Sequence, residues 1–563
     1  MTTRARTLGP EPRRRAAADL AAADLDVLIV GGGVVGCGAA LDAVTRGLRV
    51  GLVEAQDFGS GTSSRSSKLI HGGLRYLEQL NLGLVREALQ ERSLILSTLA
   101  PHLARPVPFL YPLRHRVWER PYVGSGVFLY DTMGGRRGVP GHRHMSKRRV
   151  LRESPGLRDD VLVGAVKYYD GQTDDARYTM LLARTAAHYG AICVNRAQAV
   201  RFLYDGSSVA GAVIRDEETG EEHEVRARHT INAAGVWTDE IEKMGGARAP
   251  FDVRASKGVH ILVPKDRIEL SSGIISRTEK SVLFIIPWAK HWIIGTTDTP
   301  WDLDLRNPAA SRRDVDYILD HTNQLLKNPL SRDDIVGVYA GLRPLLAGNS
   351  DETAALSREH AVANPVEGLT VVAGGKYTTY RVMAKDAVDA AVSGLPEKVP
   401  ASCTHRLPLL GANGFAAAWN QRTLHARMSG LPVRRVEHML RRYGTLTTDL
   451  LDLIDERPEL GEPLAGAESY LNAEIYYAAL AEGALHLDDL LTRRTHVSIE
   501  TPDRGRAAAR PAAEIVAPLL GWDEADVDRE VAQYHARVEA ELKAEAALDD
   551  LTADAVHREA IAS

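Results

Sequence analysis

Residues 26–54, "DVLIVGGGVVGCGAALDAVTRGLRVGLVE", join a glycine-rich turn to the patterns of two strands and a helix. "VLIV" is typical of a buried parallel strand, the small residues that follow predict a helix to about Arg46, and "RVGLVE" predicts a second strand. Glu54 ends that second strand, where an acid accepts ribose hydroxyls. The turn has the GxGxxG spacing that lets a pyrophosphate approach bare backbone at a helix N-terminus, with Gly31, Gly33 and Gly36. The stretch therefore predicts a dinucleotide-binding α/β domain.

Two later segments repeat the order of a strand, a small-residue turn and a helix. They are "HTINAAGVWTDEI", residues 229–241, and "LTVVAGGKYTTYRVMAKDAVDAAV", residues 369–392. A chain that returns to its nucleotide layer this late resembles the flavoproteins of the glutathione-reductase or amino-acid-oxidase type, so FAD is favoured over NAD. In the second segment Thr378 or Thr379 is a candidate helix cap. The positive end of that helix would face the N1–C2=O edge of a flavin.

Length and composition restrict the class of protein. The chain has 563 residues, too many for one core, so two or three domains are expected. Its net charge of −5 does not indicate a nucleic-acid partner. The few cysteines form no CxxC or Cys/His cluster, which predicts a reducing compartment and no metal site. Neither a secretory signal nor a long apolar run is visible. We therefore expect a cytoplasmic protein, peripheral if it contacts the inner face of the cytoplasmic membrane.

Five segments together resemble the FAD-dependent, quinone-linked glycerol-3-phosphate dehydrogenases. They are "EAQDFGSGTSSRSSKLIHGGLRYLE" (54–78), "SKGVHILVP" (256–264), "FIIPWAKHWIIGTTDT" (284–299), "LSRDDIVGVYAGLRPL" (330–345) and "GGKYTTYR" (374–381). "ALHLDDLLTRRTHVSIETPDRG" (484–505) is similar to the C-terminal helical domain of that family, so the similarity spans about residues 24–540. The resemblance implies non-covalent FAD and oxidation of sn-glycerol 3-phosphate to dihydroxyacetone phosphate. It also implies hydride transfer from C2 to flavin N5 and electron delivery to a membrane quinone.

The stretch "SSKLIHGGLRYLE", residues 66–78, mixes cationic side chains with a glycine pair. In a chain of this family it would pass along the flavin, with Gly72 and Gly73 bringing bare backbone to the ring system. Ser63, Ser64 and Lys68 would donate to the polar edge of the ring. An amphipathic helix that tolerates the glycine pair is the alternative, at about 1 kcal/mol for each glycine. The motif and the resemblance together give the expected cofactor-binding residues Gly31, Gly33, Gly36, Glu54, Ser63, Ser64, Lys68, His71, Gly72, Gly73, Ala234, Gly235, Gly375, Lys376, Thr378 and Thr379.

The substrate that the resemblance implies is a doubly charged phosphate ester, so its site needs fixed cations and a proton acceptor. His260 lies in a strand pattern and is the preferred acceptor for the C2 hydroxyl proton, since an ordinary histidine pKa of about 6.5 suits a base at neutral pH. Arg343 is the competing residue for steering that proton. The resemblance implies a substrate-binding set of Arg75, Tyr76, His260, Arg343, Arg358 and Lys376.

The expected fold is an FAD-binding Rossmann-type α/β domain with a mixed-sheet substrate domain and an α-helical C-terminal domain. "SVLFIIP" and "HWIIGTTD" flank a "WAK" turn and predict a hairpin in a sheet above the flavin. Residues 1–23 are expected to be a flexible tail that ends in a short Ala-rich helix. The oxidoreductase region is expected at 24–400, with FAD-binding segments at about 24–100, 160–245 and 365–400 and the substrate domain at about 101–159 and 246–364. Residues 401–563 predict the helical domain.

Residues 114–149 form a basic segment with interleaved aromatic residues. Its basic residues are Arg114, Arg116, Arg120, Arg136, Arg137, Arg143, Lys147, Arg148 and Arg149, against the acids Glu119 and Asp131. Its aromatic residues are Trp118, Tyr122, Phe128 and Tyr130. One interpretation is a solvated loop with some core aromatics. The other is a patch that docks on anionic lipid, with about 1 kcal/mol from each basic residue, which suits an enzyme that reduces a lipid-soluble quinone.

Three other functions stay open at this point. A glycerol-3-phosphate oxidase that reduces oxygen would share these residues. A relative of the amino-acid oxidases would need fewer cations, because it binds a single carboxylate. A flavin- or phosphate-binding regulator without turnover belongs to another functional class. The sequence does not indicate the oligomeric state, and a homodimer is open.

Overall fold

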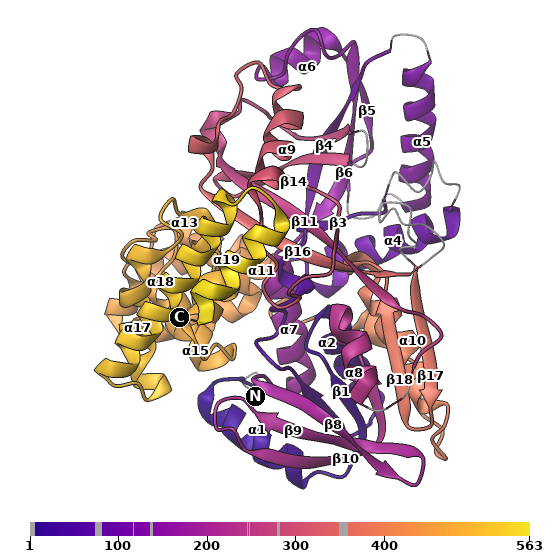
Figure 1. Ribbon diagram of the computed structural model, residues 1–563. Coiled ribbons are helices and arrows are strands. Elements are labelled where there is room, and N and C mark those ends of the chain that lie inside the picture. Colours follow the sequence, from indigo (N-terminus) through magenta and orange to yellow (C-terminus); the bar gives the residue numbers. More distant parts are fainter. Residues whose placement is uncertain are drawn as a thin grey trace.

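The computed structural model describes residues 6–73, 81–115, 118–134, 139–244, 246, 248–278, 282–347 and 359–562 (Figure 1). Two large sheets and a set of C-terminal helices make up this part of the chain. In Figure 1 the first sheet lies at the bottom, the second above it, and the orange and yellow C-terminal helices beside both. The α/β fold with a mixed second sheet and a helical C-terminal domain is confirmed.

The first sheet has eight strands in the order β17-β18-β10-β1-β2-β7, with β8 and β9 joined to β10. The pairs β10–β1, β1–β2, β2–β7 and β10–β18 are parallel, whereas β17–β18, β9–β10 and β8–β9 are antiparallel. The strands are β1 (Leu25–Val30), β2 (Val50–Val53), β7 (Ile192–Val194), β8 (Ala197–Asp205), β9 (Ser208–Asp216), β10 (Glu222–Asn232), β17 (His360–Val366) and β18 (Leu369–Gly374). The predicted parallel strands β1 and β18, which are more than 300 residues apart in the chain, thus belong to one sheet.

Both faces of strand β1 are buried, which explains its continuous apolar run. Val27 and Ile29 belong to the core that the sheet shares with helices α2 (Val34–Thr45), α7 (Asp175–His188) and α10 (Tyr380–Val392). Leu28 and Val30 point the other way, into a core with the β8–β9 ladder. Helix α2 begins directly after the glycine-rich turn, and its first residue, Val34, lines the cavity described below.

The N-terminal segment differs from the predicted flexible tail. Residues Pro10–Ala22 form helix α1, whose Leu20 is 2% exposed in the core next to β1. The Arg13 guanidinium is also buried, and it forms an ion pair with Asp216 at 3.0 Å and donates to the carbonyl of Asn195 at 2.9 Å. A buried charge needs such partners, and they hold α1 against the first sheet.

The second sheet has ten strands in the order β15-β11-β14-β13-β12-β4-β6-β3, with β16 joined to β11 and β5 to β6. The β13–β14 pair is the predicted hairpin, and β12–β4 is parallel within an otherwise antiparallel sheet. The strands are β3 (Leu69–Ile70), β4 (Arg105–Leu113), β5 (Arg143–Ser146), β6 (Gly164–Gln172), β11 (Val253–Pro264), β12 (Gly273–Arg277), β13 (Val282–Trp288), β14 (His291–Gly295), β15 (Thr299–Trp301) and β16 (Gly337–Leu346). Strand β6 had been expected in the nucleotide layer, but it pairs with β4 in this sheet.

Four helices accompany the second sheet: α4 (Leu82–Leu94), α5 (Glu119–Gly134), α6 (Lys147–Glu153) and α9 (Arg312–Asn323). The short α8 (Thr238–Met244) follows β10 in the first. The C-terminal helices are α11 (Phe415–Asn420), α12 (Arg422–Ser429), α13 (Val433–Tyr443), α14 (Thr447–Glu456), α15 (Asn472–Ala481), α16 (Val497–Glu500), α17 (Arg506–Leu520), α18 (Glu524–Ala546) and α19 (Asp550–Ala562).

Buried ion pairs join the C-terminal helices to both sheets. Asp57, in the loop after β2, is fully buried and accepts from Arg493 at 2.6 Å and from Arg494 at 2.6 and 2.7 Å. In the second sheet, the buried Lys257 lies 2.6 Å from the partly exposed Asp550 at the start of α19, and also 2.6 Å from Asp314 of α9. Breaking such a pair leaves an uncompensated buried charge, so the C-terminal domain is fixed on the rest of the protein.

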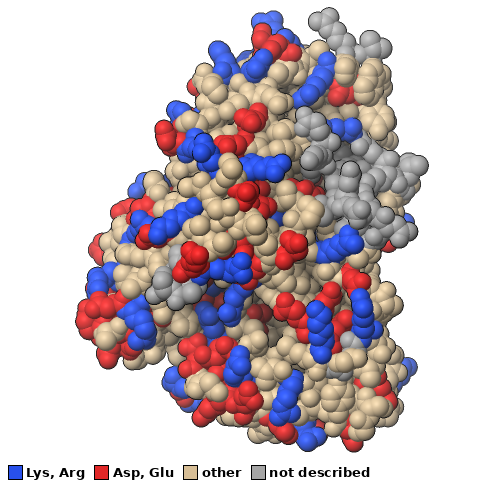
Figure 2. Space-filling model, in the orientation of Figure 1, with Lys and Arg blue, Asp and Glu red and all other residues tan. Residues whose placement is uncertain are grey.

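Lys and Arg are mixed with Asp and Glu over the face shown in Figure 2. No helix in the described part of the chain is long and apolar enough to span a membrane. Among the same residues, no group of three or more His, Cys, Asp or Glu side chains is placed to hold a metal ion.

Candidate active site

A cavity of about 600 Å³ lies between the two sheets. Its walls come from the turns that follow β1, β10 and β18 in the first sheet and from β11 and β16 in the second. This volume is in the range of about 300–1,000 Å³ that small-molecule sites have. The cavity also lies at the carboxyl ends of parallel strands, where open α/β sheets bind their ligands.

The glycine-rich turn forms one end of the cavity, where Gly31 and Gly33 line the wall. Gly31 has φ +111°, and an added Cβ would lie 2.7 Å from the carbonyl oxygen of Ala233. Ser63 also lines this end, and its hydroxyl accepts from the Val34 N–H at 2.9 Å, at the start of α2. A Cβ on Gly36 would lie 1.8 Å from the Gly31 carbonyl oxygen, so Gly36 serves the contact of helix and turn and lies behind the lining.

Glu54 lies at the same end, directly after β2. Its carboxylate accepts from the Gly32 N–H at 2.7 Å and from the Gln56 N–H at 2.8 Å. Burial raises the pKa of Glu54, while these two backbone donors oppose that shift. Ala234 and Gly235 line the cavity from the turn after β10. The acid is thus held in a fixed position beside the glycine-rich turn.

The turn after β18 forms another wall, with Gly375, Lys376 and Thr378 in the lining. The Thr378 hydroxyl accepts from the His71 N–H at 3.1 Å and donates to the His71 carbonyl at 3.3 Å. Thr378 therefore ties His71, which also lines the cavity, to this turn. Thr379 stands at the N-cap of α10 without a side-chain cap bond and lies outside the lining. The expected threonine cap is thus absent from this described helix start.

Gly72 and Gly73 differ from their expected role, because neither belongs to the described lining of the cavity. A Cβ on Gly72 would lie 2.5 Å from the Leu89 side chain and 2.9 Å from the ring of Tyr130. The Gly72 N–H also donates to the Tyr130 hydroxyl at 2.7 Å. Gly72 is therefore bare so that α4 and α5 can pack on the chain, and Gly73 provides a turn with φ +75°.

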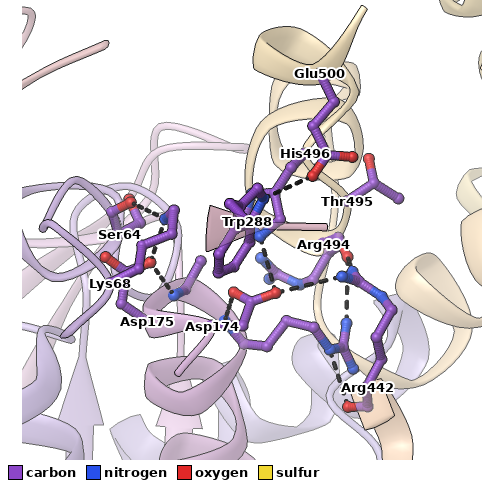
Figure 3. Close-up of polar contacts among 12 residues, drawn as sticks. Ser64, Lys68, Asp174, Asp175, Trp288, Arg442, Arg494, Thr495, His496 and Glu500 are labelled. Atoms are coloured by element: carbon purple, nitrogen blue, oxygen red, sulfur yellow. Dashed lines mark hydrogen bonds and ion pairs between the residues drawn. The ribbon is translucent and has the colours of Figure 1, made fainter. Parts of the chain in front are cut away.

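Ser64 and Lys68 were expected at the flavin edge, but the described lining of this cavity includes neither. The Lys68 side chain is 1% exposed, and its ammonium lies 2.5 Å from Asp175 and 3.2 Å from the Ser64 carbonyl (Figure 3). It also lies 5.5 Å from the ring centre of Trp288. A buried ammonium is costly without an anion, so Asp175 determines where Lys68 points.

Strands β11 and β16 bring the candidate substrate residues to one wall. In their antiparallel register, His260 is opposite Tyr339 and Ser256 is opposite Arg343. His260 and Arg343 therefore share a face of the sheet, and both line the cavity, as does Lys376. The Arg343 guanidinium donates to the Thr296 hydroxyl at 3.0 Å and to the Thr297 carbonyl at 3.2 Å. The expected residues Arg75, Tyr76 and Arg358 lie outside the described residues.

His260 is buried, and its ring is stacked on that of Tyr339, with 4.8 Å between centroids and 12° between planes. Nε2 lies 2.8 Å from the Ser67 hydroxyl, and Ser67 itself lines the cavity. Burial and the positive charges of Arg343 and Lys68 lower the pKa of His260 well below its usual value. The imidazole is therefore neutral at physiological pH, which is the form that can accept a proton.

The sequence analysis missed Ser67 and Tyr339. Ser67 is one of several serines in a short polar run, and nothing in its spacing separates it from its neighbours. Tyr339 could have been found from its strand pattern. It lies four residues before Arg343 in "GVYAGLRPL", and residues an even number apart in a strand face the same side.

Comparisons with known proteins agree with this arrangement. A family model described as "FAD dependent oxidoreductase" matches residues 26–387, and one described as "C-terminal domain of alpha-glycerophosphate oxidase" matches residues 402–527. Glycerol-3-phosphate dehydrogenase 2 of Mycobacterium tuberculosis is 57% identical over 550 residues, which cover 98% of this chain and 94% of that protein. The mitochondrial glycerol-3-phosphate dehydrogenase of Mus musculus is 37% identical over 89% of this chain and 71% of that protein.

A solved structure is similar over nearly the whole chain. It is the glycerol-3-phosphate dehydrogenase from Bacillus halodurans complexed with FAD, with a TM-score of 0.78 at 28% identity. The similarity covers 95% of this chain and 98% of that chain. It therefore includes the two sheets that enclose the cavity and the C-terminal helices.

Proposed function

Because this chain belongs to the FAD-dependent glycerol-3-phosphate dehydrogenase family, we propose that it oxidises sn-glycerol 3-phosphate to dihydroxyacetone phosphate and passes the electrons to a membrane quinone. The observation that carries the proposal is the shared cavity. His260, Arg343 and Lys376 line the same space as Gly31, Gly33 and Glu54. A proton acceptor and two cations thus lie in one chamber with a dinucleotide turn.

FAD is the cofactor, and the residues at the cavity wall fit it. Gly31 and Gly33 expose backbone at the start of α2, where a pyrophosphate is favoured. Glu54 is held by two backbone N–H groups at the place where a ribose acceptor is needed. Of the predicted cofactor residues, those in the lining are Gly31, Gly33, Glu54, Ser63, His71, Ala234, Gly235, Gly375, Lys376 and Thr378. When bound, FAD supplies the two-electron redox chemistry.

Arg343 and Lys376 are the groups that we assign to the substrate phosphate. Guanidinium bonds to a phosphate are charge-assisted and directional. Arg343 is held by Thr296 and Thr297 on one side, so its orientation toward the cavity is set before a substrate binds. Arg75, Tyr76 and Arg358 remain proposed substrate contacts on the family resemblance alone.

His260 is the group that we assign to the C2 hydroxyl proton. Its neutral state at physiological pH and its place on the wall beside Arg343 both suit that role. Arg343 cannot serve as the base, because a guanidinium does not lose its proton in proteins. It would instead stabilise the alkoxide character that develops as the proton leaves.

A membrane-docking surface on α5 supports delivery to a quinone. Trp118, Tyr122, Phe128 and Leu129 are 57%, 51%, 61% and 40% exposed on or next to this helix. Trp118, Tyr122 and Leu129 follow a spacing of four and seven residues, so they share one helix face. Large exposed aromatic side chains are typical of peripheral membrane helices. Tyr130 differs from the other aromatics of the segment, because it is buried and donates to Asp170 at 2.6 Å.

Basic residues lie next to this helix. Strand β5 packs on α5, since a Cβ on Gly124 would lie 2.7 Å from the His144 ring. Arg143 and Arg148 are exposed at β5 and at the start of α6, and Arg114 is exposed before α5. The side chains of Arg116, Arg136 and Arg137 lie outside the described residues. We propose that this surface binds anionic lipid on the inner face of the cytoplasmic membrane, with the rest of the enzyme in the cytoplasm.

Anaerobic reduction of the FAD-loaded protein tests the proposed function. Glycerol 3-phosphate is expected to bleach the flavin absorbance rapidly, and glycerol or lactate at the same concentration to do so far more slowly. A soluble quinone analogue should then reoxidise the flavin. Protein that stays colourless after FAD is added, or that glycerol 3-phosphate does not bleach, would overturn the proposal. Stoichiometric peroxide under air, with slow quinone reduction, would point to an oxidase instead.

A further inference from the structure

We propose that Ser67 is a further catalytic residue, which relays the proton of the substrate hydroxyl to His260. The inference rests on the proposed function and adds to it a group that the sequence motifs did not single out. Its starting point is the 2.8 Å contact between the Ser67 hydroxyl and His260 Nε2.

The two ring nitrogens of His260 have different surroundings. Nδ1 is buried and has no hydrogen-bond partner among the described residues. The ring is confined on one face by Tyr339, and a Cβ on Gly295 would lie only 2.5 Å from its Cδ2. Nε2 is therefore the nitrogen that exchanges a proton with the cavity. In the tautomer that carries its proton on Nδ1, the Nε2 lone pair accepts from the Ser67 hydroxyl 2.8 Å away, and a substrate proton would reach the ring through that hydroxyl.

The loop that carries Ser67 is anchored on both sides of this residue. The Ser66 hydroxyl donates to Asp175 at 2.6 Å, and the Lys68 ammonium lies 2.5 Å from the same carboxylate. Asp175 is fully buried at the first turn of α7. The Tyr339 hydroxyl, from the residue stacked on His260, donates to the Ser66 carbonyl at 2.9 Å. The loop and the ring thus share supports, which keeps Ser67 and His260 at a fixed separation.

The C-terminal domain holds the same anchor. Asp174 precedes Asp175 and lies 2.8 Å from His496 and 3.3 Å from Arg442. Figure 3 draws these contacts as dashed lines. His496 and Arg442 both belong to the C-terminal domain. In Figure 3, Lys68 and Ser64 approach the acid pair from one side, and His496 and Arg442 from the other. Contacts within the chain therefore fix the loop that carries Ser67.

The relay conserves atoms and electrons. The O–H bond of the C2 hydroxyl breaks and its proton goes to Ser67 Oγ, while the Ser67 proton goes to His260 Nε2. FAD, which Gly31, Gly33 and Glu54 would hold, would supply the two-electron acceptor for the hydrogen and electron pair of the C2–H bond. The products are a ketone at C2, reduced FAD, an imidazolium ring and an unchanged serine. The step uses the tautomer in which Nδ1 carries the ring proton.

Flavin reduction in the anaerobic FAD holoenzyme at saturating glycerol 3-phosphate tests the relay. We expect Ser67→Ala to slow reduction by about tenfold or more, as for other positioned proton-transfer groups, with FAD content and substrate Kd unchanged. Ser67→Thr keeps a hydroxyl and is expected to recover most of the rate. In the double variant Ser67→Ala/His260→Ala, the second loss should add little to that of His260→Ala alone, because both residues serve one step. The exposed hydroxyl of Ser97 provides a control, and Ser97→Ala should reduce at the wild-type rate.

A proton inventory gives a readout that a structural role would not change. In mixtures of H₂O and D₂O, the wild-type rate is expected to curve with deuterium content, because two protons move together, and Ser67→Ala should give a straight line. A linear wild-type plot would overturn the relay whether or not any variant folds. So would Ser67→Ala that reduces as fast as wild type, or losses that add fully in the double variant. Wild-type flavin that glycerol 3-phosphate fails to reduce would instead contradict the proposed function itself.

Discussion

The imidazole of His260 lies parallel to the phenol ring of Tyr339, with 4.8 Å between the ring centres. The stack places the histidine between an aromatic face and the Ser67 hydroxyl, away from bulk water. Such surroundings disfavour the charged ring. The stack thus orients the group that we assign to proton transfer, while burial and the charges of Arg343 and Lys68 lower its pKa.

The first prediction concerns the pH dependence of flavin reduction at saturating substrate. Burial and the charges of Arg343 and Lys68 lower the pKa of His260, so the ring stays neutral where an ordinary histidine would become protonated at about pH 6.5. Between pH 8 and 6 the limiting rate should show no fall caused by this residue. The fall should begin at lower pH, and Arg343→Met should move it upward because one repelling charge is gone. A midpoint near pH 6.5 in the wild type would contradict this.

The second prediction concerns His260 itself. His260→Ala should lower kcat by about 100-fold or more, the usual loss for a general base, while FAD content stays unchanged. Flavin absorbance per chain and steady-state turnover measure the two effects separately. His223→Ala removes a partly exposed histidine of β10 that does not line the cavity, and it serves as the control. Turnover of His260→Ala close to wild type would remove this residue from the mechanism.

The third prediction assigns Arg343 to the phosphate. Arg343→Ala should weaken binding of glycerol 3-phosphate by about ten- to 150-fold, the range for one charge-assisted hydrogen bond. Oxidation of glycerol, which lacks the phosphate, should lose much less. Arg248, which is exposed and paired with Asp252, provides a matched arginine-to-alanine control. Equal losses for both substrates would mean that Arg343 does not recognise the phosphate.

The fourth prediction concerns the aromatic face of α5. Flotation with vesicles that contain anionic phosphatidylglycerol should recover the wild-type protein, and added salt should reduce binding because it screens the basic residues. The triple change Trp118→Ser, Tyr122→Ser and Leu129→Ser removes the shared face and should abolish flotation, with flavin reduction unaffected. Met428 is also exposed, on α12, and Met428→Ser should float normally. Equal binding to neutral and anionic vesicles would contradict the role of the charges.

The fifth prediction concerns stability at alkaline pH. His486 lies 2.8 Å from Glu530 and 3.1 Å from Glu218, and these acids raise its pKa to about 10 despite its burial. A raised folded-state pKa gives stability that is complete below the unfolded value of about 6.5 and is lost as the pH rises through 10. The melting temperature should therefore fall over that window. His486→Gln should have a lower melting temperature at pH 7 and a smaller fall, and parallel curves would contradict the assignment.

Much of the nucleotide half could be predicted because its signals are local. Gly31 and Glu54 belong to a continuous strand–turn–helix–strand unit, so spacing alone places them together. The second sheet was harder. In the chain, strand β6 lies between β5, which belongs to the second sheet, and β7, which belongs to the first. Only its pairing with the distant β4 shows that β6 belongs to the second sheet.

The expected flavin contacts that lie outside the described lining of the cavity share a physical cause. A glycine such as Gly72 can make room either for a ligand or for neighbouring side chains. The sequence does not show which of the two will contact it. A lysine such as Lys68 is directed by its anion, and Asp175 lies 107 residues away. The N-terminal helix depends in the same way on Asp216, which the sequence could not pair with Arg13. Long-range partners therefore account for most of the differences.

The pairing of Asp57 with Arg493 makes a loop at the nucleotide end of the cavity depend on the C-terminal domain. These residues are separated by 436 positions, yet the aspartate lies in the loop between Glu54 and Ser63. A chain that ends before this arginine would leave the aspartate as an uncompensated buried charge beside the glycine-rich turn. Truncations upstream of Arg493 should therefore lose flavin as well as stability, although no residue beyond 400 lines the cavity in the described part of the chain.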